Sequence, residues 1–198
     1  NTNNALLNLL SLRDNIPNTK HFYVLKLSNI PWNLNIKDVL FYLKDFDISM
    51  NHVYPNYNQS IHIIMNRLTG KTQSDCFIEF SDFHSVQKIL NHYSKGILKG
   101  RIINITLSNQ YELMKSLFPS KYLTIDNNSN ENYNNNTENI GNVYLTRDEI
   151  NSILLVCKNY KLHFSRKCAE RPFENIISIM TKIPWDNIND ITTYHRDH

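Results

Sequence analysis

Basic and aromatic side chains occur together at two places in this sequence, and they are the residues with the clearest potential chemistry. Guanidinium and ammonium groups attract phosphates, while aromatic rings stack on flat ligands such as bases. The candidate contact residues of the first group are Lys26, Trp32, His62, Arg67, Lys71, Phe77, Lys99, Arg101 and Asn104. Those of the second group are Lys161, Arg166, Lys167 and Arg171, interleaved with Tyr160, His163 and Phe164. The alternative for both groups is a charged surface that only interacts with water.

The net charge of +3 is small, but it is distributed unevenly along the chain. Residues 20–110 hold 10 Lys and Arg against 6 Asp and Glu, and residues 158–171 hold 5 against 1. Between these regions, residues 120–145 hold 1 Lys or Arg against 3 Asp and Glu. Two basic regions are thus separated by a slightly acidic spacer, which permits a nucleic acid partner without demonstrating one.

Sequence motifs for other kinds of chemistry are missing. The sequence contains no phosphate-binding P-loop, no G-x-S-x-G, no H-E-x-x-H and no paired-carboxylate motif. The spacing of Cys157 and Cys168 relative to the histidines near them fits no common zinc site. We therefore expect no enzymatic activity, no cofactor and no metal.

The cysteine count and the hydropathy indicate the compartment. Three cysteines without any C-x-x-C argue against a disulfide framework and for a reducing environment. The first residues lack the features of a signal peptide, and no window approaches the roughly 20 apolar residues of a membrane span. We expect a cytoplasmic or nuclear protein that does not contact a membrane.

Alternating apolar residues predict strands in the first half of the chain, and apolar residues at helical spacing predict helices. The expected strands are 21–27, 60–65, 75–80 and 102–107, and the expected helices are 36–46 and 82–93. Turns are expected at 66–71, around Gly70, and at 95–101. The order β-α-β-β-α-β predicts an α+β, ferredoxin-like fold.

Strand alternation assigns these side chains to two faces of the expected sheet. Lys26, Asp75 and Phe77 fall on one face, where Lys26 and Asp75 could form a cross-strand ion pair. The opposite face, packed into the core, receives Leu25, Leu27, Cys76, Ile78 and Phe80.

The first and third strands carry a specific resemblance. With LKLSNI at 25–30 and QSDCFIEF at 73–80, the segment 20–109 resembles an RNA recognition motif (RRM), whose hexamer and octamer occupy those strands. The chain departs from the family at Lys26, which replaces the hexamer aromatic, and at Gln73, Ser74 and Asp75, which replace the basic, glycine and aromatic positions of the octamer. Of the usual stacking residues only Phe77 remains, so the resemblance implies a divergent RRM.

The loop after the first strand carries a second resemblance. LSNIPWNLN is similar to the quasi-RRM group of the heterogeneous nuclear ribonucleoprotein F/H type, which grips RNA with loops rather than with the sheet. This resemblance implies that Trp32 contacts RNA; the alternative is an indole packed at the bottom of the core. The group's Arg-Gly pair is Ser28-Asn29 here, so its preference for G-tracts does not transfer.

Composition and capping signals divide the remainder of the chain. We expect an N-terminal segment at 1–19, a capping helix at 110–119 that lies across the sheet or beside it, a flexible Asn-rich linker at 120–145, and a helical extension at 146–198. Within the extension, apolar residues at helical spacing favour a helix from 171. The alternative is the first strand of a second RRM, because Ile183-Pro184-Trp185 repeats Ile30-Pro31-Trp32.

These observations predict a protein that binds single-stranded RNA, with messenger RNA as target and post-transcriptional regulation as role. The helical extension could also contact a protein partner. The alternative is a protein-interaction module that keeps the RRM fold but has lost RNA binding by the sheet. Peptide-binding members of the family carry an Arg-x-Phe before the fourth strand, and HYSKGILKGR at 92–101 lacks it.

Overall fold

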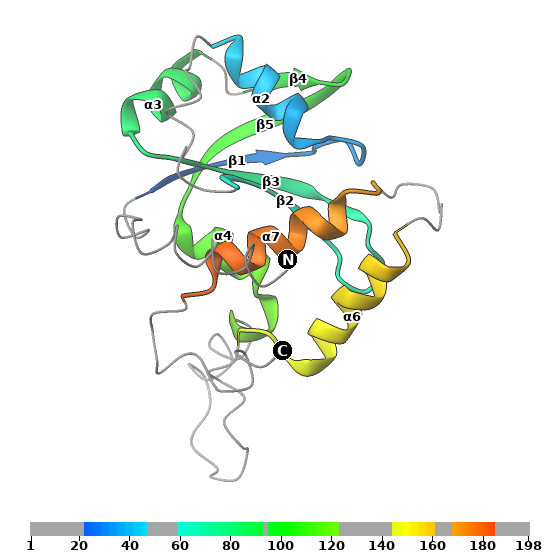
Figure 1. Cartoon of the computed structure of the whole chain (residues 1–198). Helices are drawn as coiled ribbons and strands as arrows, with labels where there is room; N and C mark the ends of the chain where they lie inside the picture. The colour runs from blue at the N-terminus through cyan, green and yellow to red at the C-terminus, as the bar shows by residue number, and fades with distance from the viewer. Residues whose placement is uncertain (1–21, 47–58, 93–94, 123–143, 161–167, 185–198) are drawn as a thin grey trace, which may run out of the picture.

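The structure is a computed structural model, and it describes residues 22–46, 59–92, 95–122, 144–160 and 168–184 (Figure 1). The strands are β1 (Tyr23–Ser28), β2 (Ile61–Met65), β3 (Thr72–Phe80), β4 (Lys95–Leu98) and β5 (Arg101–Ser108). The helices are α2 (Ile36–Lys44), α3 (Phe83–His92), α4 (Gln110–Leu117), α6 (Arg147–Lys158) and α7 (Arg171–Lys182). The expected N-terminal segment 1–19 and most of the expected linker lie outside the described residues.

The strands form one antiparallel sheet in the order β2-β3-β1-β5-β4, which confirms the α+β, βαββαβ fold. One expectation was wrong. Residues 95–101 were expected only to turn the chain, but Lys95–Leu98 form the edge strand β4 and pair with β5. The two strands are joined at Lys99 and Gly100, whose φ values are 48° and 76°. Positive φ at both positions gives the turn the twist that a two-residue hairpin needs.

One face of the sheet packs on α2 and α3 to form the main core (Figure 1). Helix α2 begins with a capping box, in which Asn35 and Asp38 each accept a hydrogen bond from the other's backbone N–H. The residues expected in this core from strand alternation are buried there: Leu25, Leu27, Cys76, Ile78 and Phe80. Burial raises the pKa of the Cys76 thiol to about 12, so it is a packing residue rather than a nucleophile.

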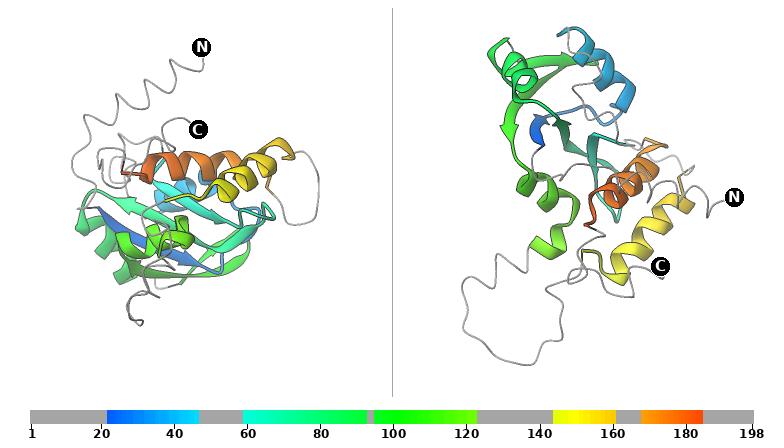
Figure 2. Two further views of the ribbon diagram at one scale, coloured as in Figure 1. Left: turned by 90° about the horizontal axis from the view of Figure 1, so that it is seen from below. Right: turned by 60° about the vertical axis from the view of Figure 1, so that its left-hand side comes forward.

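The opposite face of the sheet is covered by α4, α6 and α7, which form a second core with it (Figure 2). The members of this core are Val24, Ile64 and Phe77 from the sheet, and Leu113, Leu117, Phe118, Tyr144, Leu145, Ile153, Ile179 and Ile183 from the helical segments. The capping helix therefore lies across the sheet. Residues 171–182 are a helix, so the strand alternative for this segment was wrong. The C-terminal helices pack on the RRM-like unit rather than extending away from it.

Helix α6 approaches the turn between β2 and β3 closely. Gly70 has a φ of 71°, and a Cβ at this position would lie 2.7 Å from a methyl carbon of Val156. Both the backbone conformation and the contact with α6 therefore require glycine. Among the described residues, none of the helices combines the length and apolar character that crossing a membrane requires.

Candidate nucleic-acid interface

The sheet face that carries Phe77 is closed to solvent. Phe77 and His62 are both 0% exposed, because α7 packs on β2 and α4 packs on β1, and Phe77 of β3, the strand between them, joins their core. Sequence reasoning placed both side chains among the RNA contacts; in this structure neither can reach an RNA. The physical reason is that the apolar residues of α4 and α7 are removed from water when these helices pack on this face of the sheet.

A buried polar network replaces the missing stacking surface. His62 lies between Glu79 and the Ser178 hydroxyl, with ring nitrogens 2.7 and 2.8 Å from these two partners. Lys182 donates to Glu79 at 3.0 Å and to Gln110 at 2.7 Å. Burial alone would raise the pKa of Glu79, but Lys182 and the hydrogen bonds from His62 and Gln110 lower it to about 2. The network fastens α7 and α4 to the sheet.

Lys26 lies at the border of the covered area. Its ammonium is 3.1 Å from Glu112 of α4 and 3.6 Å from Asp75, which confirms the expected cross-strand ion pair. Partial burial lowers the pKa of Lys26, but the bonds to Glu112 and Asp75 outweigh this and raise it above its ordinary value. Lys26 therefore links α4 to the sheet with its charge already paired.

The loop after β1 presents Trp32 on a well-held turn. The Leu34 N–H donates to the Pro31 carbonyl at 3.1 Å, so Trp32 sits inside a tight turn. Lys99 donates to the Asn33 carbonyl at 2.8 Å, and its ammonium is 3.0 Å from Asp38. The Trp32 side chain is 43% exposed and is not part of either core, so the packed-indole alternative was wrong.

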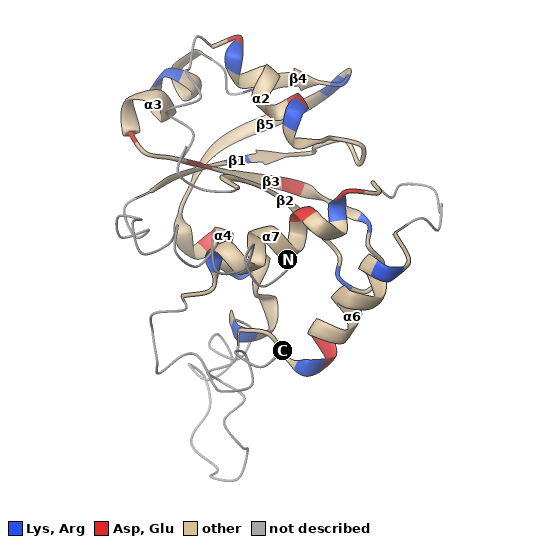
Figure 3. Ribbon diagram, in the orientation of Figure 1, with Lys and Arg blue, Asp and Glu red and all other residues tan. Residues whose placement is uncertain are grey.

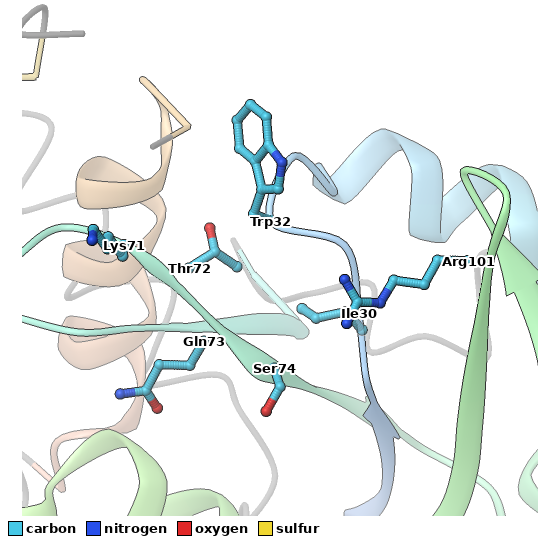
Figure 4. Close-up of a pocket in the computed structure, with 7 residues that line it drawn as sticks. All are labelled: Ile30, Trp32, Lys71, Thr72, Gln73, Ser74 and Arg101. Carbon is cyan, nitrogen blue, oxygen red and sulfur yellow. The ribbon is translucent and has the colours of Figure 1, made fainter. Parts of the chain in front are cut away.

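A pocket of about 570 Å³ opens beside this turn (Figure 4). It brings together three of the predicted contact residues: Trp32 from the turn, Lys71 from the position just before β3, and Arg101 from the start of β5. The remaining lining residues are Ile30, Thr72, Gln73 and Ser74. The lining thus combines an exposed indole, two cations and several polar groups, with no acidic side chain.

Arg101 is oriented by Asn29. The Asn29 side-chain oxygen accepts from Nη2 and Nε of Arg101 at 2.6 and 3.2 Å, and its amide nitrogen donates to the Ile102 carbonyl at 2.8 Å. Asn29 has a φ of 64°, a conformation that asparagine tolerates better than most residues. Sequence analysis missed this role, although an Asn before the Pro-Trp turn was a usable signal.

The other predicted contact residues are scattered. Arg67 pairs with Glu149 of α6 at 2.7 Å and is largely buried. Arg171 is 0% exposed and bonds inside the protein, so the prediction that it contacts RNA was also wrong. Asn104 is exposed on β5, on the part of the sheet that the helices leave open. The predicted contacts Lys161, Arg166 and Lys167 lie outside the described residues.

Charge does not single out another surface. Lys and Arg are spread over many elements and alternate with Asp and Glu (Figure 3). Within the described ranges, no group of three or more His, Cys, Asp or Glu side chains is arranged to hold a metal ion. The pocket beside Trp32 is therefore the best candidate site in the described part of the chain.

Two family models match the chain. The model described as Domain of unknown function (DUF8400) matches residues 21–125, and the model described as Domain of unknown function (DUF8399) matches residues 142–198. No curated protein matches the chain.

The chain is structurally similar, at low sequence identity, to solved RRM domains. The qRRM2 domain of Glorund has 19% identity and a TM-score of 0.40, over 48% of this chain and 98% of that one. G-rich RNA sequence binding factor 1 from Homo sapiens has 21% identity and a TM-score of 0.38, over 56% and 99%. The RRM of Rna15 with bound RNA (GU) has 15% identity and a TM-score of 0.35, over 57% and 99%. These similarities concern the fold.

Proposed function

The chain belongs to the family described as Domain of unknown function (DUF8400), and we propose that it binds single-stranded RNA through the pocket beside Trp32. Messenger RNA is the proposed target, and post-transcriptional regulation is the proposed role. The observation that carries the proposal is the convergence of Trp32, Lys71 and Arg101, which are distant in sequence, on one pocket.

Each of the three side chains has a task in this proposal. The Trp32 indole stacks on a base, a contact worth about 1–3 kcal/mol per base. Lys71 and Arg101 neutralise phosphates on either side of that base. Gln73 and Ser74 lie in the same lining and supply hydrogen-bonding groups for base edges. The resemblance of the Pro31-Trp32 loop to the quasi-RRM group, which grips RNA with loops, supports the same arrangement.

The test is a binding measurement with a labelled pool of single-stranded oligoribonucleotides. Trp32→Ala should weaken binding by about 1–3 kcal/mol. Phe41→Ala is the matched control, because Phe41 is an exposed aromatic residue on α2 (69% exposed) and does not line the pocket. Equal affinities for wild type, Trp32→Ala and Phe41→Ala would contradict the assignment of the pocket.

The cations are tested by the salt dependence of the same affinity. Each phosphate contact contributes a slope of about 0.7 in a plot of log K against log salt for single strands. Lys71→Ala together with Arg101→Ala should therefore flatten the slope by about 1.4. The control is Lys44→Ala with Arg147→Ala, which removes two exposed cations outside the pocket.

The alternative function, a protein-interaction module, is favoured by one observation. The sheet face that an ordinary RRM uses for RNA is occupied by the chain's own helices. If the full chain binds no oligoribonucleotide at low salt, the RNA-binding proposal is wrong and the fold serves to present protein surfaces.

A further inference from the structure

Arg171 is placed where a cation is physically unfavourable. It is the first residue of α7, and the N-terminal end of a helix carries a partial positive charge that disfavours Lys and Arg. Its side chain is also 0% exposed, and burying a guanidinium costs several kcal/mol unless its donors are bonded. Such a residue must be held by specific partners.

All three guanidinium nitrogens have a partner. Nε donates to the Thr72 hydroxyl at 3.0 Å, Nη2 donates to the Leu34 carbonyl, and Nη1 donates to the Glu174 carboxylate. Burial raises the pKa of Glu174, although the charge of Arg171 opposes the shift. The planar guanidinium can satisfy three acceptors in fixed directions, which a lysine ammonium cannot reproduce.

Two of these acceptors belong to the two chain segments that supply Trp32 and Thr72 to the pocket. The Leu34 carbonyl ends the turn Pro31–Leu34 that presents Trp32, and Thr72 lines the pocket at the start of β3. A backbone hydrogen bond also joins these segments, from the Ile30 N–H to the Ser74 carbonyl at 3.1 Å, beside the β1–β3 ladder that pairs Ser28 with Asp75. Arg171 is thus a further connection between the two segments, and it comes from helix α7.

We propose that Arg171 is a positioning residue of the pocket, and that through it helix α7 supports the RNA-binding site. This inference rests on the proposed function. Arg171, at the N-terminal end of α7, sets the separation of the Trp32 turn and β3, so displacing this end of the helix loosens the pocket. RNA binding and the docking of the N-terminal end of α7 are therefore coupled.

Lys182 provides a matched control. It lies at the other end of α7, about 16 Å away at 1.5 Å per residue. It is buried as well and bonds α7 to Glu79 of the sheet and to Gln110 of α4. Lys182→Met therefore weakens the docking of α7 without removing a bond to the segments that supply Trp32 and Thr72.

The experiment compares Arg171→Met, Arg171→Lys and Lys182→Met in the full chain carrying Trp185→Phe. The chain has two tryptophans, so this background leaves Trp32 as the sole tryptophan. Acrylamide quenching of Trp32 without RNA reports the position of the indole, and thermal unfolding reports stability. Titration with the oligoribonucleotide pool reports affinity.

We expect both Met variants to lower the unfolding temperature, and only Arg171→Met to change the quenching of Trp32. The same variant should raise the dissociation constant for RNA by about tenfold. If Arg171→Met does not fold, Arg171→Lys keeps the positive charge and should show the same two changes to a smaller degree. Unchanged quenching in the Arg171 variant that folds, or equal changes in Lys182→Met, would overturn the inference.

The same measurements distinguish a failure of the proposed function from a failure of the positioning role. If the Trp185→Phe chain binds no RNA, the assignment of the pocket to RNA is wrong, and with it the claim that Arg171 forms part of an RNA site. If RNA binds and depends on Trp32 but not on Arg171, the proposed function stands and the positioning role is overturned.

Discussion

Phe77 is a side chain whose role in the structure differs from the role that its strand position suggests. Its position in QSDCFIEF corresponds to a base-stacking ring in the RRM family, and strand alternation assigns it to the expected face. In the structure this ring lies in the second core, and the Lys26 ammonium is 5.7 Å from its centroid. Its contribution is therefore to stability.

Replacing Phe77 tests this role. Phe77→Ala should lower the free energy of unfolding by about 3–5 kcal/mol, because it leaves a cavity under α4 and α7. Urea unfolding measures the effect, and exposed Phe41→Ala should change stability by less than about 0.5 kcal/mol. A Phe77→Ala protein of normal stability that has lost RNA binding would show that the ring is available to RNA after all.

The buried carboxylate of Glu79 predicts a dependence of stability on acid. Its pKa is about 2 in the folded protein against a reference value of 4.5 in the unfolded chain. A lowered pKa means that the contribution is complete above about pH 4.5 and is lost as the pH falls towards 2.

The variant that tests it is Glu79→Gln combined with Lys182→Met, which removes both charges together. We expect the stability advantage of the wild type over this double variant to shrink between about pH 5 and pH 2. The measurement is the midpoint of urea unfolding of the wild type and the double variant at several pH values across this range. A constant difference would mean that Glu79 is not held ionised by its neighbours.

At the scale of elements, the segment between α4 and α6 joins two places that are already close. The Phe118 and Tyr144 rings have centroids 5.1 Å apart, and the Lys121 ammonium lies 3.5 Å from the Tyr144 centroid. Tyr122 and Tyr144, the residues on either side of the segment 123–143, both pack in the second core.

This geometry makes the expected linker removable. Deleting 127–140 shortens the connection about threefold, and loop-closure entropy then changes stability by only about 1 kcal/mol. Thermal unfolding of the deletion variant is the measurement. A large fall in melting temperature would show that the deleted residues pack on the protein, against the sequence-based expectation of a flexible linker.

At the scale of the whole molecule, the two units matched by separate family models share one core. Residues from β1, β2 and β3 meet residues from α6 and α7 there, and Lys182 and Ser178 of α7 complete the hydrogen bonds of Glu79 and His62. Helix α4, which belongs to the first unit, covers only part of this sheet face, so burying the rest requires α6 and α7.

Separating the two units should therefore lower the stability of the first unit against unfolding. A fragment of residues 20–125 keeps α4, but it loses the cover that α7 gives to β2, including Ile64, and it leaves Glu79 without its lysine. We expect this fragment to bind a hydrophobic dye and to unfold at lower urea concentration than the full chain carrying the 127–140 deletion. A monomeric fragment as stable as that control would mean that the C-terminal helices are dispensable for folding.

Local patterns in the sequence determined the elements and one side of the sheet. Alternation placed Leu25, Leu27 and Cys76 in the core, and the capping box at Thr146 and Glu149 marked the start of α6. These features depend on contacts between residues a few positions apart. The hairpin of β4 was missed because its strand is short and Lys99, rather than a glycine, occupies the first turn position.

Tertiary structure decided which candidate residues can meet a ligand. Trp32, Lys71 and Arg101 converge because the starts of β3 and β5 flank the end of β1 in an antiparallel sheet. His62, Phe77 and Arg171 are withdrawn from solvent because α7 docks on β2, a contact between residues more than 100 positions apart. Sequence periodicity identifies an apolar stripe but does not specify which surface buries it, since that depends on the packing of the whole chain.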